Sequence, residues 1–277
     1  MVKITFELER EVPTSRYADV VDGVGMIKSE KNISDEHVST NRGLKEIANY
    51  LTSICALFSD RDVWYRINDS QTSWVNRQIG CEEIIEESNP LMGIRGIRRA
   101  ILFPETLEKE VRMVEQIRKL YPRLHLFVPF VHLPDQIKIV KGHLSKIGYT
   151  GKFGMMAELP ASIICIDDFL DLGVDYIVVG INDLHDFTYG LCRKDDSRLR
   201  IHRDSTYKAV RKMLEPMLKN RRRNVEYCVG GEIDLERLLL FVSMGFDNII
   251  VPYKNMVNDS KLRKKLQEIR LKTVGSG

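Results

Sequence analysis

Two acidic side chains each directly follow a short apolar run of the chain, where they could bind a metal ion. Glu158 ends the segment GMMAE, and Asp183 follows Asn182 in VVGIND. In proteins Mg²⁺ typically takes one or two carboxylates and fills its octahedron with water and substrate oxygens. Glu158 and Asp183 are therefore predicted to hold one Mg²⁺ ion if the fold brings the two runs together.

Cationic side chains occupy comparable places in the chain. Lys28 ends GVGMIK, Arg66 ends VWYR, and Arg95 lies in NPLMGIRG. The guanidinium group of arginine binds phosphate or carboxylate through two parallel hydrogen bonds. A metal ion beside several cations predicts a small anionic substrate with oxygen ligands. Cys228, in VEYCVGGE, is expected to face the metal, where a thiol could donate or accept a proton at carbon.

Each of these residues also has a structural explanation. Asn182 and Asp183 could cap the following helix. Cys228 taken alone is more often a buried structural thiol than a catalytic one, and an isolated arginine is more often a surface or salt-bridge residue. A shared site is favoured only because five different elements are predicted to place polar groups at one rim.

Eight short β-rich runs, separated by helical segments, would position these residues. Several runs are continuously apolar, as strands buried on both faces must be. The predicted strands are Lys3–Phe6, Gly23–Ile27, Val63–Ile67, His125–Phe130, Phe153–Glu158, Tyr176–Gly180, Val225–Val229 and Asn248–Val251. This alternation predicts an α/β fold, a (β/α)₈ TIM barrel, as a single domain over residues 1–277, with its chemistry at the carboxyl ends of the strands. A doubly wound open sheet is the alternative.

Helical periodicity fills the gaps between the runs. Pro104 and Pro134 each stand before such a pattern, as proline often does at the first position of a helix. A C-terminal helix is expected over residues 260–274. The longest connection, Asn68 to Ala100, shows no clear apolar periodicity, and a loop of that length usually has a function.

Composition restricts the class of partner. The chain of 277 residues has 42 basic and 39 acidic side chains, a net charge of +3, which is too balanced to indicate a nucleic-acid partner. No apolar run approaches the roughly 18 residues of a membrane span. The five cysteines include no CxxC pair, which favours a reducing compartment, and we expect a cytoplasmic protein.

Six segments resemble, in order, the motifs of the phosphoenolpyruvate (PEP)/pyruvate-binding C-terminal barrel domain of the PEP-utilising enzymes. These enzymes are PEP synthase, pyruvate phosphate dikinase and enzyme I of the sugar phosphotransferase system. The segments are DGVGMIKSE (22–30), NPLMGIRGIR (89–98), VPF (128–130), GMMAELPA (154–161), GINDL (180–184) and CVGGE (228–232). They resemble (D/E)GIGLxRTE, NPxLGxRGxR, IPF or MPF, GxMIEIPA, GTNDL and CGE or CGQ. The resemblance covers nearly the whole chain, from about Ile4 to about Pro252.

The resemblance implies a role for each matching residue. Glu158 and Asp183 would bind magnesium, and Cys228 would exchange the proton at the methyl or methylene carbon. Asn182, Arg66 and Arg95 would hold the phosphoryl group and the carboxylate or enolate oxygen. The full set of implied substrate-binding residues is Lys28, Arg66, Arg95, Glu158, Gly180, Ile181, Asn182 and Asp183.

The chain departs from the family pattern at several positions. Lys28 replaces the arginine of RTE, which keeps the charge and loses the bidentate fork. Ile181 replaces the threonine of GTND, which removes a hydroxyl near the substrate. CVGGE carries two more residues than CGE, so the placement of Gly230, Gly231 and Glu232 is open. These changes bear on substrate identity and rate.

The resemblance implies a Mg²⁺-dependent phosphotransferase that moves a phosphoryl group between the enolate oxygen of pyruvate and a phosphohistidine. The chain shows no swivelling-histidine motif and no ATP-grasp domain, so that phosphohistidine is expected on a separate partner. A homodimer is possible because related enzymes commonly pair through this domain. Two alternatives stay open: a metal-dependent lyase or aldolase acting on a 2-oxo acid through an enolate, and a non-catalytic PEP sensor or binding module.

Overall fold

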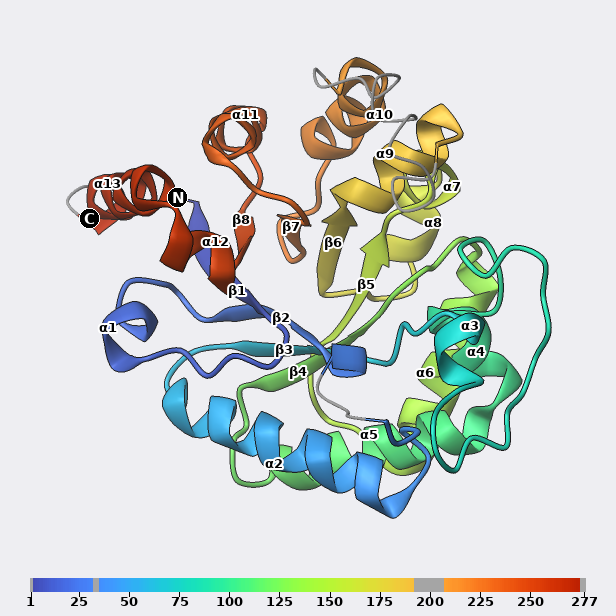
Figure 1. Cartoon of the computed structure of the whole chain (residues 1–277). Coiled ribbons are helices and arrows are strands. Elements are labelled where there is room, and N and C mark those ends of the chain that lie inside the picture. The colour runs from blue at the N-terminus through green and yellow to red at the C-terminus, as the bar shows by residue number, and fades with distance from the viewer. Residues whose placement is uncertain (1, 32–34, 192–206, 275–277) are drawn as a thin grey trace.

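Eight parallel strands close into a barrel in chain order, with the helices outside it (Figure 1). The computed structural model describes residues 2–31, 35–191 and 207–274. The strands are β1 (Lys3–Leu8), β2 (Val24–Lys28), β3 (Val63–Arg66), β4 (Leu124–Val128), β5 (Phe153–Ala157), β6 (Tyr176–Gly180), β7 (Glu226–Gly230) and β8 (Asn248–Pro252). Pairing of β1 with β8 completes the ring, which confirms the TIM barrel and excludes the open sheet.

The helices follow the predicted alternation. Both α5 and α6 begin at the prolines that the sequence marks. The connection between β3 and α5 contains two short helices, α3 and α4, that the sequence pattern did not predict. The helices are α1 (Ser15–Ala18), α2 (Asn41–Leu57), α3 (Thr72–Val75), α4 (Gly96–Leu102), α5 (Pro104–Arg118), α6 (Pro134–Ile147), α7 (Pro160–Ile164), α8 (Ile166–Leu170), α9 (Ile181–Tyr189), α10 (Lys208–Lys219), α11 (Leu235–Met244), α12 (Tyr253–Asn258) and α13 (Ser260–Val274). Within the described ranges, no helix is long and apolar enough to cross a membrane.

Large side chains fill the middle of the barrel. The ring of Trp64 stacks on Tyr176 with 3.9 Å between centroids, and the Tyr176 hydroxyl donates a hydrogen bond to the Gly25 carbonyl at 3.0 Å. The cluster comprises Met26, Trp64, Phe127, Met156, Tyr176, Val178, Cys228 and Ile250. The interior is therefore a packed core, and a ligand can enter only above it, at the carboxyl ends of the strands.

Gly154 on β5 is required by this packing. A Cβ atom there would lie 2.8 Å from the Tyr176 carbonyl oxygen and 2.9 Å from the Cβ of Phe127. Both contacts are closer than side chains tolerate, so the two neighbouring strands would have to move apart.

We expect Gly154→Ala to lower the free energy of unfolding by about 1–3 kcal/mol, the usual cost of overpacking a core. The matched control is Gly142→Ala on α6, where a Cβ meets nothing within 4 Å. That change should raise stability by about 0.5–1 kcal/mol because alanine favours a helix over glycine. Denaturant unfolding of both variants checks this, and equal stability of the two would contradict it.

Candidate functional site

The uppermost inward-facing positions of the strands form the floor of one pocket. Register pairs Lys28 with Arg66, Glu7 with Pro252 and Gly180 with Gly230, so these residues lie near one level. Charged side chains come from β1, β2 and β3, while β6, β7 and β8 contribute two glycines and a proline. The pocket has a volume of about 860 Å³, and its lining includes Glu7, Lys28, Arg66, Asp69, Arg95, Asn182 and Asp183.

Glu158, just after β5, is buried at the same end of the barrel. Its Oε1 accepts a hydrogen bond of 2.7 Å from the backbone N–H of Phe130. Phe130 adopts a positive φ of 62°, which is rare for an aromatic residue and turns its N–H toward the carboxylate. A Cβ at Gly180 would lie 2.8 Å from the Cβ of Glu158 and 2.6 Å from its Oε2, so glycine is needed at this position.

Acidic neighbours surround Glu158. Burial, together with the charges of Asp183 and Asp69, raises the pKa of Glu158 to about 8, against the opposing effect of Arg95 and Arg66. The fold thus brings the two predicted magnesium ligands, Glu158 and Asp183, into one electrostatic cluster. Like charges held this close favour a bound proton or a bound cation.

Arg95 bridges the acidic groups. Its Nε and Nη2 atoms donate to Asp69 at 3.0 and 2.5 Å, and Nη2 also lies 3.2 Å from Asp183 Oδ2. The guanidinium lies over the Phe130 ring, 4.6 Å from its centroid. Its pKa is raised because the acidic neighbours outweigh burial, so Arg95 stays charged.

Arg66 and Lys28 each pair with a carboxylate that the sequence patterns did not single out. Arg66 forms an ion pair with Glu30 and lies 3.5 Å from Asp69 Oδ2. Lys28 forms an ion pair with Glu7. Glu7 could have been found from strand alternation, since Lys3, Thr5 and Glu7 share one face of the strand KITFEL (residues 3–8).

The charge balance of this cluster fits a divalent cation. Three cations, Lys28, Arg66 and Arg95, face five carboxylates, which gives a formal charge of 3 − 5 = −2 when Glu158 is ionised and leaves the cluster negative even when Glu158 carries a proton. The carboxylates are those of Glu7, Glu30, Asp69, Glu158 and Asp183. Among the described residues, no three His, Cys, Asp or Glu side chains form a ready metal cage. A metal would therefore take the Glu158–Asp183 pair and complete its shell with water and ligand oxygens.

The two residues that precede Asp183 on α9 differ in what they offer a ligand. Asn182 lines the pocket, and its buried Oδ1 has no hydrogen-bond partner within the described ranges. Ile181 is fully buried in the hydrophobic core, and its methyl group lies close to Gly231. The Asn182 side chain can therefore bind a ligand, whereas Ile181 packs in the core next to Gly231.

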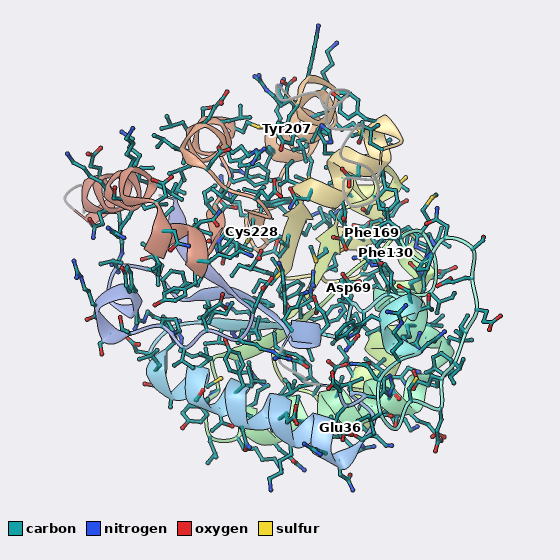
Figure 2. The ribbon with its side chains drawn as sticks, viewed as in Figure 1. Glu36, Asp69, Phe130, Phe169, Tyr207 and Cys228 are labelled. Carbon is teal, nitrogen blue, oxygen red and sulfur yellow. The ribbon has the colours of Figure 1, made fainter. Side chains whose placement is uncertain are left out.

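The prediction that Cys228 lies at the rim and faces the metal is wrong. Cys228 sits in the middle of β7, paired with Val178 and Asn248, and is fully buried in the barrel interior (Figure 2). Its sulfur lies 3.9 Å from Glu226 Oε1, below the mouth. Burial raises the pKa of this thiol well above its usual value.

Cys228 does not reach the mouth because β7 extends beyond it and because successive side chains of a strand point to opposite faces. β7 continues through Val229 to Gly230, so the inward-facing residue at the mouth is Gly230, two residues after Cys228. The sequence Gly230–Glu232 then matches the CGE pattern without extra residues, with glycine in place of the thiol.

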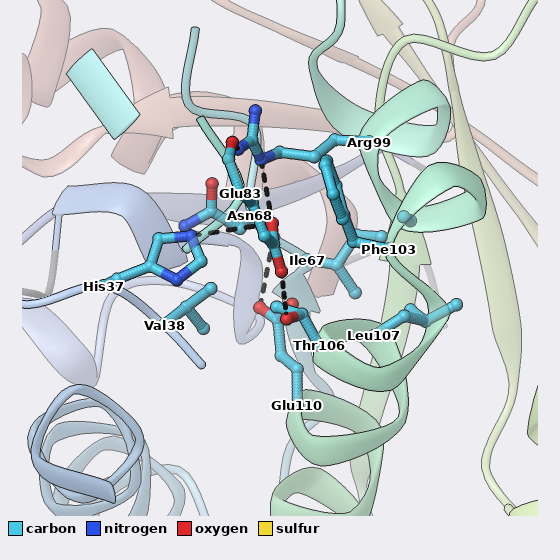
Figure 3. Close-up of a pocket in the computed structure, with 11 residues that line it drawn as sticks. His37, Val38, Ile67, Asn68, Glu83, Arg99, Phe103, Thr106, Leu107 and Glu110 are labelled. Carbon is cyan, nitrogen blue, oxygen red and sulfur yellow. Dashed lines mark hydrogen bonds and ion pairs between the residues drawn. The ribbon is translucent and has the colours of Figure 1, made fainter. Parts of the chain in front are cut away.

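A second polar cluster secures the long connection that carries Asp69 and Arg95. Figure 3 shows its pocket, a cavity of about 20 Å³, room for about one water molecule. There Glu83 accepts a hydrogen bond from Arg99 at 3.2 Å and a second from Thr106. Glu110 accepts one of 2.6 Å from the Tyr65 hydroxyl. Its burial raises the pKa of Glu110 to about 7.

Next to Arg95 the same connection is held by Glu87. The Glu87 carboxylate accepts hydrogen bonds from the Thr72 hydroxyl at 2.6 Å and from the Ile94 N–H at 2.9 Å. The Glu87 carboxylate thus fixes the backbone immediately before Arg95, which explains how a segment without apolar periodicity holds a defined shape.

The fold and this pocket define a class: a closed α/β barrel with a charged pocket at the carboxyl ends of its strands. Residues 2–268 match the family described as "PEP-utilising enzyme, PEP-binding domain", and the chain belongs to that family. The implied resemblance is thereby confirmed.

Similar proteins agree with this assignment. The phosphoenolpyruvate synthase of Pyrococcus furiosus is 31% identical over 266 residues, covering 90% of this chain and 32% of the relative. A probable phosphoenolpyruvate synthase of Methanocaldococcus jannaschii is 27% identical over 237 residues, covering 80% and 20%. The chain spans about a third or less of these relatives.

Solved structures share the barrel. Pyruvate kinase from Pyrobaculum aerophilum superimposes with a TM-score of 0.58 at 12% identity, over 98% of this chain and 72% of that one. RipC from Yersinia pestis gives a TM-score of 0.54 at 9% identity, over 96% and 95%. At these identities the likeness concerns the fold alone.

The raised pKa of Glu158 predicts how stability depends on pH. A carboxyl group whose pKa is higher in the folded state binds a proton more tightly there, so its contribution is lost as pH rises toward about 8. Glu110, with a pKa of about 7, changes the stability with pH in the same direction. Without divalent cations, unfolding in urea should therefore show lower stability at pH 8.5 than at pH 6.

The control is the Glu158→Gln variant, in which this decline should be smaller, leaving the part due to Glu110. Stability that rises between pH 6 and 8.5 in the wild type, or an unchanged slope in the variant, would count against this account of the site.

Proposed function

We propose that this barrel, taken as one unit over residues 1–277, binds PEP or pyruvate with Mg²⁺ and transfers a phosphoryl group between the enolate oxygen and a phosphohistidine. The observation that carries the proposal is the convergence of Glu158, Asp183, Arg66 and Arg95 at one mouth, where carboxylates outnumber cations. The phosphohistidine would belong to a separate protein or to a further part of a longer one.

The carboxylates of Glu158 and Asp183 would hold the metal, which would supply electrophilic stabilisation of an enolate oxygen. Arg66 would receive the anionic ligand through its Nε, which is buried and has no hydrogen-bond partner in the described part of the chain. Arg95, fixed by Asp69 and Phe130, would present its charge to the phosphoryl group. Binding of the ligand and metal would then satisfy polar groups that are costly to leave unpaired.

Lys28 has a smaller part in this proposal than the family pattern implies. Its pKa is raised because the pull of Glu7 outweighs burial, so the ammonium persists, but Glu7 offsets its charge. We therefore assign the phosphoryl group to Arg66 and Arg95, and Gly180 to making room for Glu158.

A second candidate function is a PEP sensor that binds without reaction. One observation favours it: the mouth-facing position of β7 is Gly230, which supplies no acid or base. Phosphoryl transfer, described below, separates the two functions.

Metal and ligand binding test the first step. Titration calorimetry with Mg²⁺ and oxalate, an analogue of the pyruvate enolate, should detect binding that requires the metal. Glu158→Gln or Asp183→Asn should weaken it by about 100-fold, or roughly 2.8 kcal/mol. The affinity for Mg²⁺ should increase as pH rises toward about 8, because the metal must displace the proton on Glu158.

The matched control is Asp135→Asn, an exposed carboxylate on α6 paired with Lys138, which should leave binding unchanged. Oxalate binding that is indifferent to Mg²⁺ and to both site variants would refute the assignment of the metal pair.

Phosphoryl transfer tests the second step. With radiolabelled PEP and a swivelling-histidine domain of this enzyme family, label should appear on the histidine and pyruvate should be released. Arg66→Met should reduce the rate by at least about 100-fold, since arginine clamps contribute that much or more to phosphoryl transfer. PEP binding without any transfer would instead support the sensor.

A further inference from the structure

The pocket has an acid–base candidate on the wall opposite the proposed metal pair. In a closed ring of eight strands, β1 faces β5 and β2 faces β6. Glu7 on β1 and Lys28 on β2 therefore stand across the mouth from Glu158 and Asp183. On the arc of the barrel between these two walls, β6, β7 and β8 present only Gly180, Gly230 and Pro252 at this level.

One carboxylate oxygen of Glu7 is paired with a cation, and the other has no hydrogen-bond partner among the described residues. Its Oε1 pairs with Lys28, and the Lys28 ammonium also lies 3.5 Å from Glu9 Oε1. Its Oε2 is buried and, among the residues that the structure describes, has no hydrogen-bond partner. The side chain is 5% exposed yet lines the pocket. A buried carboxylate oxygen without a partner is costly unless a ligand or a proton satisfies it.

Two carboxylates at the mouth have a buried oxygen without a hydrogen-bond partner among the described residues, Glu7 through Oε2 and Glu30 through Oε2. Glu30 pairs with Arg66, whose charge the proposed phosphoryl transfer needs, so Glu7 is the better candidate. Cys228 lies below the packed layer, and Gly230 has no side chain. Arg66 and Arg95 remain cationic. The Glu232 side chain is 58% exposed and lies 3.7 Å from Arg237, outside the buried floor.

We propose that Glu7 is the acid–base residue of this site, with Lys28 as its positioning residue. This inference rests on the proposed binding of pyruvate. The methyl C–H bond of bound pyruvate breaks, its electron pair forms the C=C bond of the enolate, and the carbonyl oxygen takes the negative charge. The proton goes to Glu7 Oε2, and the reverse step returns it to carbon. Lys28 holds Oε1, so that Oε2 faces the ligand.

The experiment is exchange of deuterium from D₂O into the methyl group of pyruvate, with Mg²⁺ and the full chain, followed by NMR. Wild type should exchange, and Glu7→Gln should exchange at least about 100-fold more slowly, as expected for loss of a general base. Oxalate should still bind to Glu7→Gln, equally or more tightly, since a negative charge has been removed. Cys228→Ser is the matched control and should exchange at the wild-type rate.

Chemical rescue distinguishes an acid–base role of Glu7 from a purely structural one. Glu7→Ala should regain exchange when formate is added, because formate can occupy the vacated carboxylate position, and Glu7→Gln should not. Exchange that survives in Glu7→Gln, that disappears in Cys228→Ser, or that is absent from a wild type that binds pyruvate would overturn the assignment of Glu7. A wild type that binds neither pyruvate nor oxalate would instead overturn the proposed function itself.

Discussion

The site depends on holding several carboxylates close together at the mouth of the barrel. Glu158, Asp183 and Asp69 repel one another in a buried setting, where charge is poorly solvated. Arg95 compensates by contacting two of the three, and stays charged because it does so. Removing one partner from such a network is more costly than the network's net contribution, because it leaves an unpaired buried charge. The remaining negative charge is what would attract the divalent cation of the proposed function.

The rest of the structure keeps this cluster in place. Arg95 lies on a long connection, and its position follows from three carboxylates away from the mouth: Glu87 beside it, Glu83, and the buried Glu110. The packed layer around Trp64 and Tyr176 closes the barrel from below. A ligand therefore meets a rigid charged floor rather than a channel, which suits binding that must be pre-organised.

The chain is similar to its family along the whole barrel but differs from the family motifs at several residues of the mouth. Identity near 31% to phosphoenolpyruvate synthase extends along nearly the whole barrel. Yet the mouth differs from the family motifs at Lys28, at Ile181 and at Gly230. Two of these changes have structural counterparts, since Lys28 pairs with Glu7 and Ile181 packs in the core beside Gly231. In the proposed chemistry, proton transfer at carbon is therefore the step most open to change, while the two proposed metal ligands and both arginines of the family motifs are kept.

The sequence by itself determined the barrel, the helix starts at Pro104 and Pro134, and the polar residues that end β2 and β3 or follow β5 and β6. It could do so because strands buried on both faces read as apolar runs, and the first polar residue after a run marks the rim. Only the tertiary structure decided that Glu7 pairs with Lys28, that Glu30 pairs with Arg66, and that Glu87 holds the backbone beside Arg95. These contacts join residues far apart in the chain, which no local pattern encodes. It also decided the place of Cys228, because one more residue of strand changes which side chain reaches the mouth, and strand ends are set by pairing with neighbouring strands.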